Sequence, residues 1–348
     1  MAEFNIKGRV SQVQKRILGK TNYEVSVVGF GGIPIQRVDK KEAMTLISAA
    51  SDQGINFIDT ATGYSDSEAL IGYGIEHDGR DKWIVATKCP LRDYEGMKNA
   101  INSSLEKLRI EVIDLYQLHN VSSEVDFQQV MGDKGALKAL KEAKAEGKIK
   151  EIGITSHSVE MLEKAIETGE FSTIQFPYNL VERQGEKLFQ RAKELNLGVI
   201  IMKPIAGGAI SNPTLSLKFI MENDNISVMI PGMDKIEHII ENCKVAKFPS
   251  KLTHDEREAI KVEAEALGNV FCRRCGYCGP CPVGINIPGQ MVLEGYFLRY
   301  DLKDWAKKRY AEQVIKASDC IGCGQCEPKC PYNLDIRGSM KRIHQNLG

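Results

Sequence analysis

The sequence lacks the features that place a protein in a membrane or give it an overall charge. Its 348 residues contain no run of 18 apolar residues, and the N-terminal region has no apolar core of the kind found in secretion signals. The 46 Lys and Arg residues balance the 46 Asp and Glu residues, so no net charge attracts nucleic acid or an anionic bilayer. We therefore expect a cytoplasmic protein whose partners include neither nucleic acid nor membrane.

Cysteine is almost missing from the first three quarters of the chain. Cys89 and Cys243 are the only cysteines before residue 270, whereas the other eight lie between Cys272 and Cys330. In a chain without a secretion signal, such clustering favours metal binding over disulfides. The shift in composition predicts two domains, 1–250 and 251–348. We expect the two early cysteines to be ordinary buried side chains.

Within the first domain, short apolar runs rich in β-branched residues alternate with amphipathic stretches. Strands are predicted at 25–29, 56–61, 84–88, 112–119, 149–155, 173–178, 198–202 and 227–230. Helices are predicted between them at 40–53, 95–108, 136–146, 160–168, 185–195 and 236–246. Eight β/α units over this length favour an α/β fold of the (β/α)8 TIM-barrel type. An open doubly wound sheet is the alternative, but residues 29–32 lack the third glycine of its phosphate-binding turn.

Four ionisable side chains stand at or just after the carboxyl ends of predicted strands. Asp59 follows the second strand with Tyr64 on the next loop, Lys88 ends the third strand, and His119 ends the fourth. Each alone could be an ordinary rim residue, such as a lysine whose ammonium reaches solvent. Because the carboxyl ends of barrel strands meet at one mouth, all four are expected to converge there.

This set of side chains suits the reduction of a carbonyl group. A nicotinamide hydride would reach the carbonyl carbon, and a proton would have to reach its oxygen. Tyr64 could donate that proton if an ammonium lowered its pKa, which is near 10 when unperturbed. Lys88 would supply the ammonium, Asp59 would orient it, and His119 would bind and polarise the carbonyl oxygen.

The same region resembles the aldo-keto reductase family. The similar stretches are RILGK at 16–20, GINFIDTA at 54–61, Tyr64, SE at 67–68, VATK at 85–88 and DLYQLH at 114–119. The resemblance spans about residues 15 to 246, with the motifs in the family's order. It implies that Asp59, Tyr64, Lys88 and His119 form the family's catalytic tetrad, and that NADP(H) or NAD(H) is the cofactor.

The resemblance also implies a cofactor pocket. Thr155 and Ser156 match the segment that holds the nicotinamide carboxamide, with Gln175 as partner. Met202 stands where many members place an aromatic ring. The loop that begins at Pro204 and includes Ile205 and Gly207 would pass along the pyrophosphate. The remaining predicted cofactor contacts are Gly32, Gly232, Met233, His238, Glu241 and Asn242.

One position departs from the family pattern. Many members bind the 2′-phosphate of NADP with basic residues after the last strand, but this chain has Gly232 and Met233, then His238. Lys235 is the nearby base that could substitute. The departure favours weak discrimination between NADPH and NADH, or a preference for NADH.

The eight late cysteines form two groups of four. The first is Cys272-x2-Cys275-x2-Cys278-x2-Cys281-Pro, and the second is Cys320-x2-Cys323-x2-Cys326-x3-Cys330-Pro. The second has the spacing of bacterial ferredoxins, whereas the first is one residue shorter before its last cysteine. Zinc sites are the alternative, but they use paired cysteines with longer gaps. The pattern predicts two [4Fe–4S] clusters.

The C-terminal region is similar to dicluster ferredoxin domains fused to a subgroup of aldo-keto reductases. Helices predicted at 253–267, 287–299 and 301–314 indicate a small, mostly helical ferredoxin-like iron–sulfur domain. In two-cluster ferredoxins the cysteine before proline ligates the other cluster. We therefore expect Cys330 to complete the cluster of the first group, and Cys281 that of the second.

Two functions follow from the sequence. The first is an oxidoreductase that interconverts a small carbonyl substrate and its alcohol, with clusters that exchange electrons with a redox protein partner. The second is an electron-transfer or redox-sensing protein that uses the barrel as a scaffold. Since a hydride carries two electrons and a cluster one, a flavin would normally join them. The sequence has no flavin motif.

Overall fold

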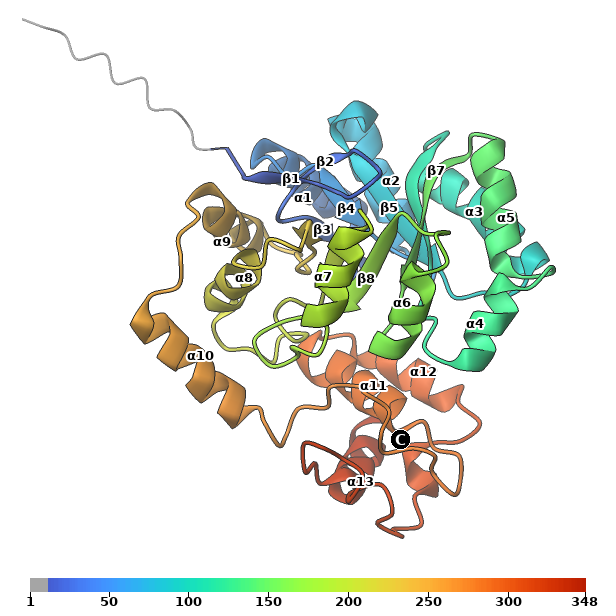
Figure 1. The fold of residues 1–348 in the computed structure, drawn as a ribbon, viewed down its shortest axis with the longest axis vertical. Coiled ribbons are helices and arrows are strands. Elements are labelled where there is room, and N and C mark those ends of the chain that lie inside the picture. The colour runs from blue at the N-terminus through green and yellow to red at the C-terminus, as the bar shows by residue number, and fades with distance from the viewer. Residues whose placement is uncertain (1–11) are drawn as a thin grey trace, which may run out of the picture.

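The computed structural model describes residues 12–348 and contains a closed parallel barrel with helices around it (Figure 1). Its strands are β3 (Phe30–Gly31), β4 (Phe57–Asp59), β5 (Ile84–Cys89), β6 (Ile113–Leu118), β7 (Ile149–Thr155), β8 (Thr173–Pro177), β9 (Gly198–Met202) and β10 (Val228–Met229). Neighbours in this order pair in parallel. Parallel bridges from Val28 to Met229 and from Gly31 to Gly232 close the ring. The predicted TIM barrel is confirmed, and residues 1–11 of the predicted first domain lie outside the described part.

The first barrel strand differs from the prediction at 25–29. Residues Glu24–Ser26 form β2, which pairs antiparallel with β1 (Lys15–Ile17) outside the barrel. The barrel strand proper is Phe30–Gly31. An unbroken apolar run does not reveal where one strand ends and the next begins. The prediction at 25–29 therefore combined the end of β2 with the residues that lead into the barrel strand.

The helices that cover the barrel follow the strands in turn. They are α1 (Lys40–Asp52), α2 (Ser67–Asp78), α3 (Tyr94–Leu108), α4 (Glu124–Met131), α5 (Ala136–Ala145), α6 (Val159–Ile166), α7 (Glu186–Glu194), α8 (Pro213–Met221) and α9 (Ile236–Lys247). Helix α1 begins with a capping box, in which the side chains of Asp39 and Glu42 accept hydrogen bonds from backbone N–H groups at the start of the helix. The sequence did not single out α2, α4 or α8.

The helix α10 (His254–Ala266) connects the barrel to the C-terminal domain (Figure 1). It begins with the capping box of Thr253 and Glu256 that its sequence predicts. An apolar cluster joins the barrel's last loops to this connection, and Leu180, Ala206, Ile260 and Phe271 belong to it. Burial of these side chains fixes the C-terminal domain against the barrel.

The C-terminal domain contains α11 (Ile287–Arg299), α12 (Lys303–Ala311) and α13 (Ile336–Leu347), with α11 and α12 lying between the barrel and α13 (Figure 1). The prediction for α11 is confirmed, whereas α12 begins two residues later than predicted. Asp301 has a φ of 52°, a left-handed conformation that cannot belong to an α-helix. Cysteines of both groups pack into this domain's apolar core.

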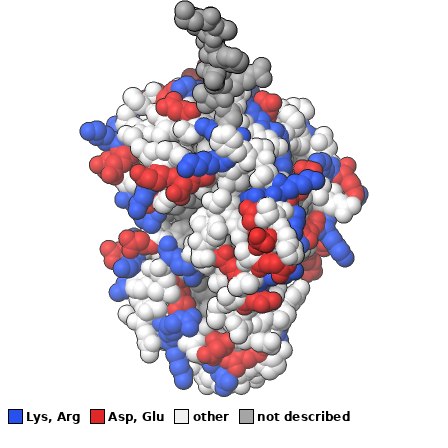
Figure 2. Space-filling model, turned by 90° about the vertical axis from the view of Figure 1, so that its left-hand side faces the viewer, with Lys and Arg blue, Asp and Glu red and all other residues white. Residues whose placement is uncertain are grey.

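The surface carries both signs of charge. On the face shown in Figure 2, Lys and Arg side chains alternate with Asp and Glu, and neither sign covers a whole side. Within residues 12–348, no helix combines the length and the apolar character needed to cross a bilayer.

Candidate functional site

The structure brings the four predicted catalytic side chains to one mouth of the barrel. Asp59 ends β4, Lys88 lies in β5, His119 directly follows β6, and Tyr64 lies on the loop after β4. Nζ of Lys88 forms an ion pair with Oδ1 of Asp59 and donates a hydrogen bond of 2.7 Å to the carbonyl oxygen of Thr60. Because both side chains of the pair are almost fully buried, this lysine cannot swing out to solvent.

Tyr64 faces both His119 and Lys88. Its ring meets the His119 ring edge to face at a centroid distance of 5.9 Å, and the Lys88 ammonium lies 5.0 Å from the Tyr64 centroid. Nδ1 of His119 is buried and has no hydrogen-bond partner among the described residues. A phenol, an imidazole and an ammonium therefore lie close together at the mouth of the barrel.

The surroundings shift the protonation of these groups in defined directions. Burial, followed by the charge of Asp59, raises the pKa of Tyr64 well above its usual value, so the phenol stays protonated at neutral pH. Burial and the cations Lys88 and Arg92 hold the pKa of His119 well below 6.5, which keeps the imidazole neutral. The sequence predicted that the lysine lowers the tyrosine pKa, whereas burial raises that pKa in the structure.

The second oxygen of Asp59 accepts hydrogen bonds from two amides. Gln117 donates to Oδ2 at 3.0 Å and Gln175 at 3.2 Å. The sequence predicts that Gln175 contacts a nicotinamide carboxamide, and in the structure its NH2 group donates to Asp59. The Oε1 atoms of both amides are buried without a partner among the described residues.

A cavity of about 200 Å³ adjoins Asp59 and Tyr64. It follows the loops after β3, β9 and β10, where the sequence predicts the cofactor. The predicted cofactor residues that line it are Gly32, Met202, Pro204, Ile205, Gly207, Gly232 and His238. These seven residues therefore share one cavity with the catalytic side chains.

The other predicted cofactor contacts lie away from this cavity. Thr155 is buried, and its Oγ1 accepts a hydrogen bond of 2.7 Å from the Asn120 amide. Ser156 is buried too and accepts one from the Ser158 amide at 2.9 Å. Of the group after β10, Met233 and Asn242 are buried and Glu241 is exposed, and none of the three lines the cavity.

Sequence reasoning missed Arg37 and Asp234, which also line the cavity. Nη2 of Arg37 lies 2.5 Å from Oδ2 of Asp234, and Nδ1 of His238 lies 3.2 Å from Oδ1 of the same carboxylate. The substitute base that the sequence suggested, Lys235, is exposed outside the cavity. No motif connects residue 37 with residue 234, so only the fold reveals this pair.

The C-terminal domain supplies part of the wall of the same cavity, which the sequence did not predict. Tyr296, Arg299 and Tyr300, from the end of α11 and the turn after it, line the cavity. Nη1 of Arg37 donates to the carbonyl oxygen of Tyr300 at 2.5 Å, and Arg309 of α12 donates to that of Gly63 at 2.7 Å. The two domains therefore build this site together.

The eight late cysteines surround two further cavities in the C-terminal domain. The first is lined by Cys272, Cys275, Cys278 and Cys330. The second is lined by Cys281, Cys320, Cys323 and Cys326. Each cavity therefore combines three cysteines of one group with the proline-following cysteine of the other.

The donor set around each cavity fits an iron–sulfur cluster, because four thiolates hold a cubane. Gly276, Gly322 and Gly324 have φ values of 81°, 70° and 74°, which let the loops turn tightly beside the thiols. Over residues 12–348, no three Cys, His, Asp or Glu side chains are grouped closely enough to hold one metal ion. Cys89 and Cys243 are buried in the barrel, as expected.

Known proteins resemble both parts of the chain. Residues 27–214 match the Aldo/keto reductase family, and residues 271–335 match the 4Fe-4S dicluster domain. An aldo-keto reductase of Bacillus subtilis is 29% identical over 237 residues, which cover 63% of this chain and 70% of that protein. L-galactose dehydrogenase of Arabidopsis thaliana is 25% identical over 306 residues, covering 73% and 95%.

Solved structures show the same fold. The holo form of an aldo-keto reductase from Bacillus halodurans superposes with a TM-score of 0.63 at 25% identity, over 73% of this chain and 97% of its own. A Klebsiella pneumoniae aldo-keto reductase in complex with NADPH gives a TM-score of 0.61 at 21% identity, over 72% and 94%. The chain belongs to the aldo/keto reductase family of oxidoreductases and carries a C-terminal 4Fe-4S dicluster domain.

Proposed function

We propose that the protein is an NAD(P)H-dependent oxidoreductase that interconverts a carbonyl and an alcohol at Asp59, Tyr64, Lys88 and His119. The observation that carries the proposal is the buried Lys88–Asp59 ion pair beside the Tyr64 ring at the mouth of the barrel. Burial and a close charge partner shift the pKa of an ionisable group, and groups shifted in this way beside a cavity are typical of catalytic sites.

Each member of the tetrad has a distinct role. Tyr64 is protonated in the resting state and donates its proton to the substrate oxygen during reduction. Neutral His119 orients that oxygen beside the phenol. Lys88, held by Asp59, stabilises the phenolate that remains. The nicotinamide, when bound, supplies or accepts the hydride.

The cofactor would lie in the cavity along Gly32, Met202, the 204–207 loop and Gly232. The Klebsiella relative in complex with NADPH supports a nicotinamide cofactor of this type. Asp234, beside Arg37 and His238, places a carboxylate in the same cavity. A carboxylate suits the ribose 2′-hydroxyl of NADH better than the 2′-phosphate of NADPH.

Two [4Fe–4S] clusters would be held by the cysteine sets of the two C-terminal cavities. Cys272, Cys275, Cys278 and Cys330 would hold one, and Cys281, Cys320, Cys323 and Cys326 the other. The clusters would supply single-electron chemistry. Cys323 is exposed, which gives a redox protein partner access to the second set.

The test is anoxic purification followed by a metal assay and an activity assay. We expect about eight irons and eight sulfides per chain, because four thiolates hold one cubane. We also expect oxidation of NADH or NADPH when an aromatic aldehyde is added. Full iron content without turnover of any carbonyl or alcohol would favour the electron-transfer or redox-sensing alternative.

A further inference from the structure

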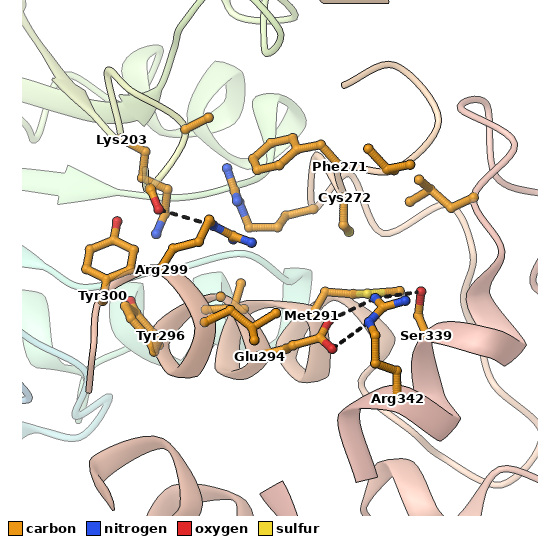
Figure 3. A pocket seen from close by; sticks show the side chains of 18 of the residues that line it. Lys203, Phe271, Cys272, Met291, Glu294, Tyr296, Arg299, Tyr300, Ser339 and Arg342 are labelled. Atoms are coloured by element: carbon orange, nitrogen blue, oxygen red, sulfur yellow. Dashed lines mark hydrogen bonds and ion pairs between the residues drawn. The ribbon is translucent and has the colours of Figure 1, made fainter. Parts of the chain in front are cut away.

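A second, larger cavity of about 420 Å³ lies between the barrel and the C-terminal domain. Lys203 and Gly207 border it on the barrel side, α11 forms one long wall, and Phe271, Cys272 and Arg342 lie around the rest (Figure 3). Its volume falls in the range that holds small organic ligands. No part of the tetrad lines it, so the proposed reaction leaves this cavity unused.

This interdomain cavity adjoins the cavity of the proposed active site. Lys203, Gly207, Tyr296, Arg299 and Tyr300 line both it and the cavity that contains Asp59 and Tyr64. A substrate whose carbonyl group lies beside Tyr64 would therefore bring its other substituents to this shared boundary. The size and charge of the shared residues would therefore select the substituents that the substrate can carry.

The boundary carries two basic side chains that form no ion pair among the described residues, Lys203 and Arg299. Two basic residues of the interdomain cavity are paired with carboxylates, Arg274 with Glu182 and Arg342 with Glu294. Among the described residues, neither Lys203 nor Arg299 has a carboxylate partner. Arg299 donates only to the Gly207 carbonyl, at 3.2 Å.

Lys203 is the more strongly constrained of these two cations. Its ammonium lies 5.6 Å from the Tyr296 ring centroid, and its backbone has a φ of 55°. Burial, followed by the charge of Arg274, lowers its pKa to about 7. Burying a charge without a partner costs free energy, and an anion would recover part of it.

We propose that the substrate is an oxo acid whose carboxylate is bound by Lys203 and Arg299 and whose apolar remainder occupies the interdomain cavity. This inference rests on the proposed carbonyl reductase function. In the reduction, a hydride from the nicotinamide adds to the carbonyl carbon and Tyr64 protonates the oxygen, which gives a hydroxy acid and the oxidised nicotinamide.

The walls beyond the boundary fit the apolar part of such a substrate. Met291, Leu298 and Leu334 of the C-terminal domain line the cavity, and Phe271 lines it beside the barrel loops. The carboxylate of Glu294 is taken up by Arg342, and Oδ1 of Asp335 accepts a hydrogen bond from the Gly338 amide. These two acids are therefore engaged within the protein, and the unbalanced cations lie at the boundary.

The test compares an acid with its neutral ester in the anoxically purified full chain. The substrates are 2-oxo-4-phenylbutanoate and its methyl ester. We expect the wild type to favour the acid in kcat/KM, and Lys203→Met or Arg299→Met to reduce the acid-to-ester ratio about tenfold or more, as the loss of a charged hydrogen bond predicts. Lys303→Met, which removes an exposed lysine of α12, should leave the ratio at the wild-type value.

Two further measurements distinguish a failure of this inference from a failure of the proposed carbonyl reductase function. Calorimetry with the unreactive acid 4-phenylbutanoate should show binding that Lys203→Met weakens, which supports the site even if no carbonyl is turned over. Turnover of the ester without preference for the acid would overturn the inference and leave the proposed function standing. A rise in the dissociation constant for NADH in Lys203→Met at an unchanged acid-to-ester ratio would assign the cations to the cofactor pyrophosphate. A flavin found in the interdomain cavity would also overturn the inference that this cavity holds the substrate.

Discussion

At the scale of single residues, the mechanism that we propose depends on how the surroundings set the protonation of Tyr64, His119 and Lys88. Burial keeps Tyr64 a neutral phenol and His119 a neutral imidazole, while Lys88 is held against Asp59. The proton to be donated is therefore already on the oxygen that donates it. Removal of that oxygen tests the arrangement without changing the ring packing.

We expect Tyr64→Phe to lower kcat for carbonyl reduction by about 100-fold or more, since general acid catalysis contributes at least that much. The dissociation constant for NADH, measured by fluorescence titration, should change little because the ring remains. Tyr73→Phe, on the outer helix α2, is the matched control. An unchanged kcat in Tyr64→Phe would remove this residue from the mechanism.

We expect Asp234→Asn to increase the affinity for NADPH about tenfold. The change removes the carboxylate that occupies Arg37 and His238, and a charged hydrogen bond to the 2′-phosphate is worth about 1.5–3 kcal/mol. Titration with NADPH and with NADH measures the effect, and the affinity for NADH should change less. The exposed Glu237→Gln serves as control. Equal shifts for both cofactors would show that this carboxylate does not discriminate between them.

At the scale of elements, the first cysteine loop is bound directly to the barrel. Arg274 pairs with fully buried Glu182 in the loop after β8, and the neighbouring Arg273 donates to the Val181 carbonyl at 3.1 Å. Asn179 adds a hydrogen bond of 2.9 Å to Glu182. The barrel therefore fixes the position of the loop that carries Cys272 and Cys275.

We expect Glu182→Gln to destabilise the protein by about 3–5 kcal/mol, because it leaves the buried Arg274 charge without its partner. Denaturant unfolding under anoxic conditions measures the loss, and iron content measures whether the loop still holds its cluster. Glu258→Gln breaks an exposed pair with Lys261 and should cost less than about 1 kcal/mol. A similar loss in both variants would show that the interdomain pair contributes no more than a surface pair.

The elements that the sequence predicts well are those with local signals. Seven of the eight barrel strands, the meeting of Asp59, Lys88 and His119 at their carboxyl ends and the capping box of Thr253 all follow from short patterns. The first strand was assigned wrongly because the pairing partner of Val25, in β1, is not encoded beside it. Tyr296 and Arg299 were predicted on a helix, but their place over the barrel mouth depends on contacts between segments far apart in the chain.

At the scale of the whole molecule, the two domains share their functional parts. The C-terminal domain forms a wall of the cavity beside Asp59 and Tyr64, and the barrel anchors a cysteine loop. Within the C-terminal domain, each cysteine cavity draws on both cysteine groups. Loss of a cysteine from one group should therefore disturb the cavity built mainly by the other group.

We expect Cys330→Ser to disturb the cluster held by Cys272, Cys275 and Cys278 rather than that of its own sequence neighbours. The reason is that Cys330 lines the first cysteine cavity, whereas Cys281 completes the second. Iron content and the electron paramagnetic resonance spectra of the reduced protein distinguish the two clusters. Cys281→Ser is the reciprocal variant and should disturb the other one. Loss of the same signal in both variants would contradict exchanged ligation.

The position of Cys330 also has a consequence for the order of events during synthesis. A ribosome completes the barrel strands well before it reaches the cysteine that closes the first cluster set, a delay on the order of ten seconds. During that interval the newborn barrel contains Asp59, Tyr64, Lys88 and His119, but it lacks the wall from α11 and the last cysteine of the first set. Under the proposed function, iron and sulfide would therefore be delivered to this set only after translation of the barrel, and the cavity beside Tyr64 would receive its last wall after its catalytic side chains.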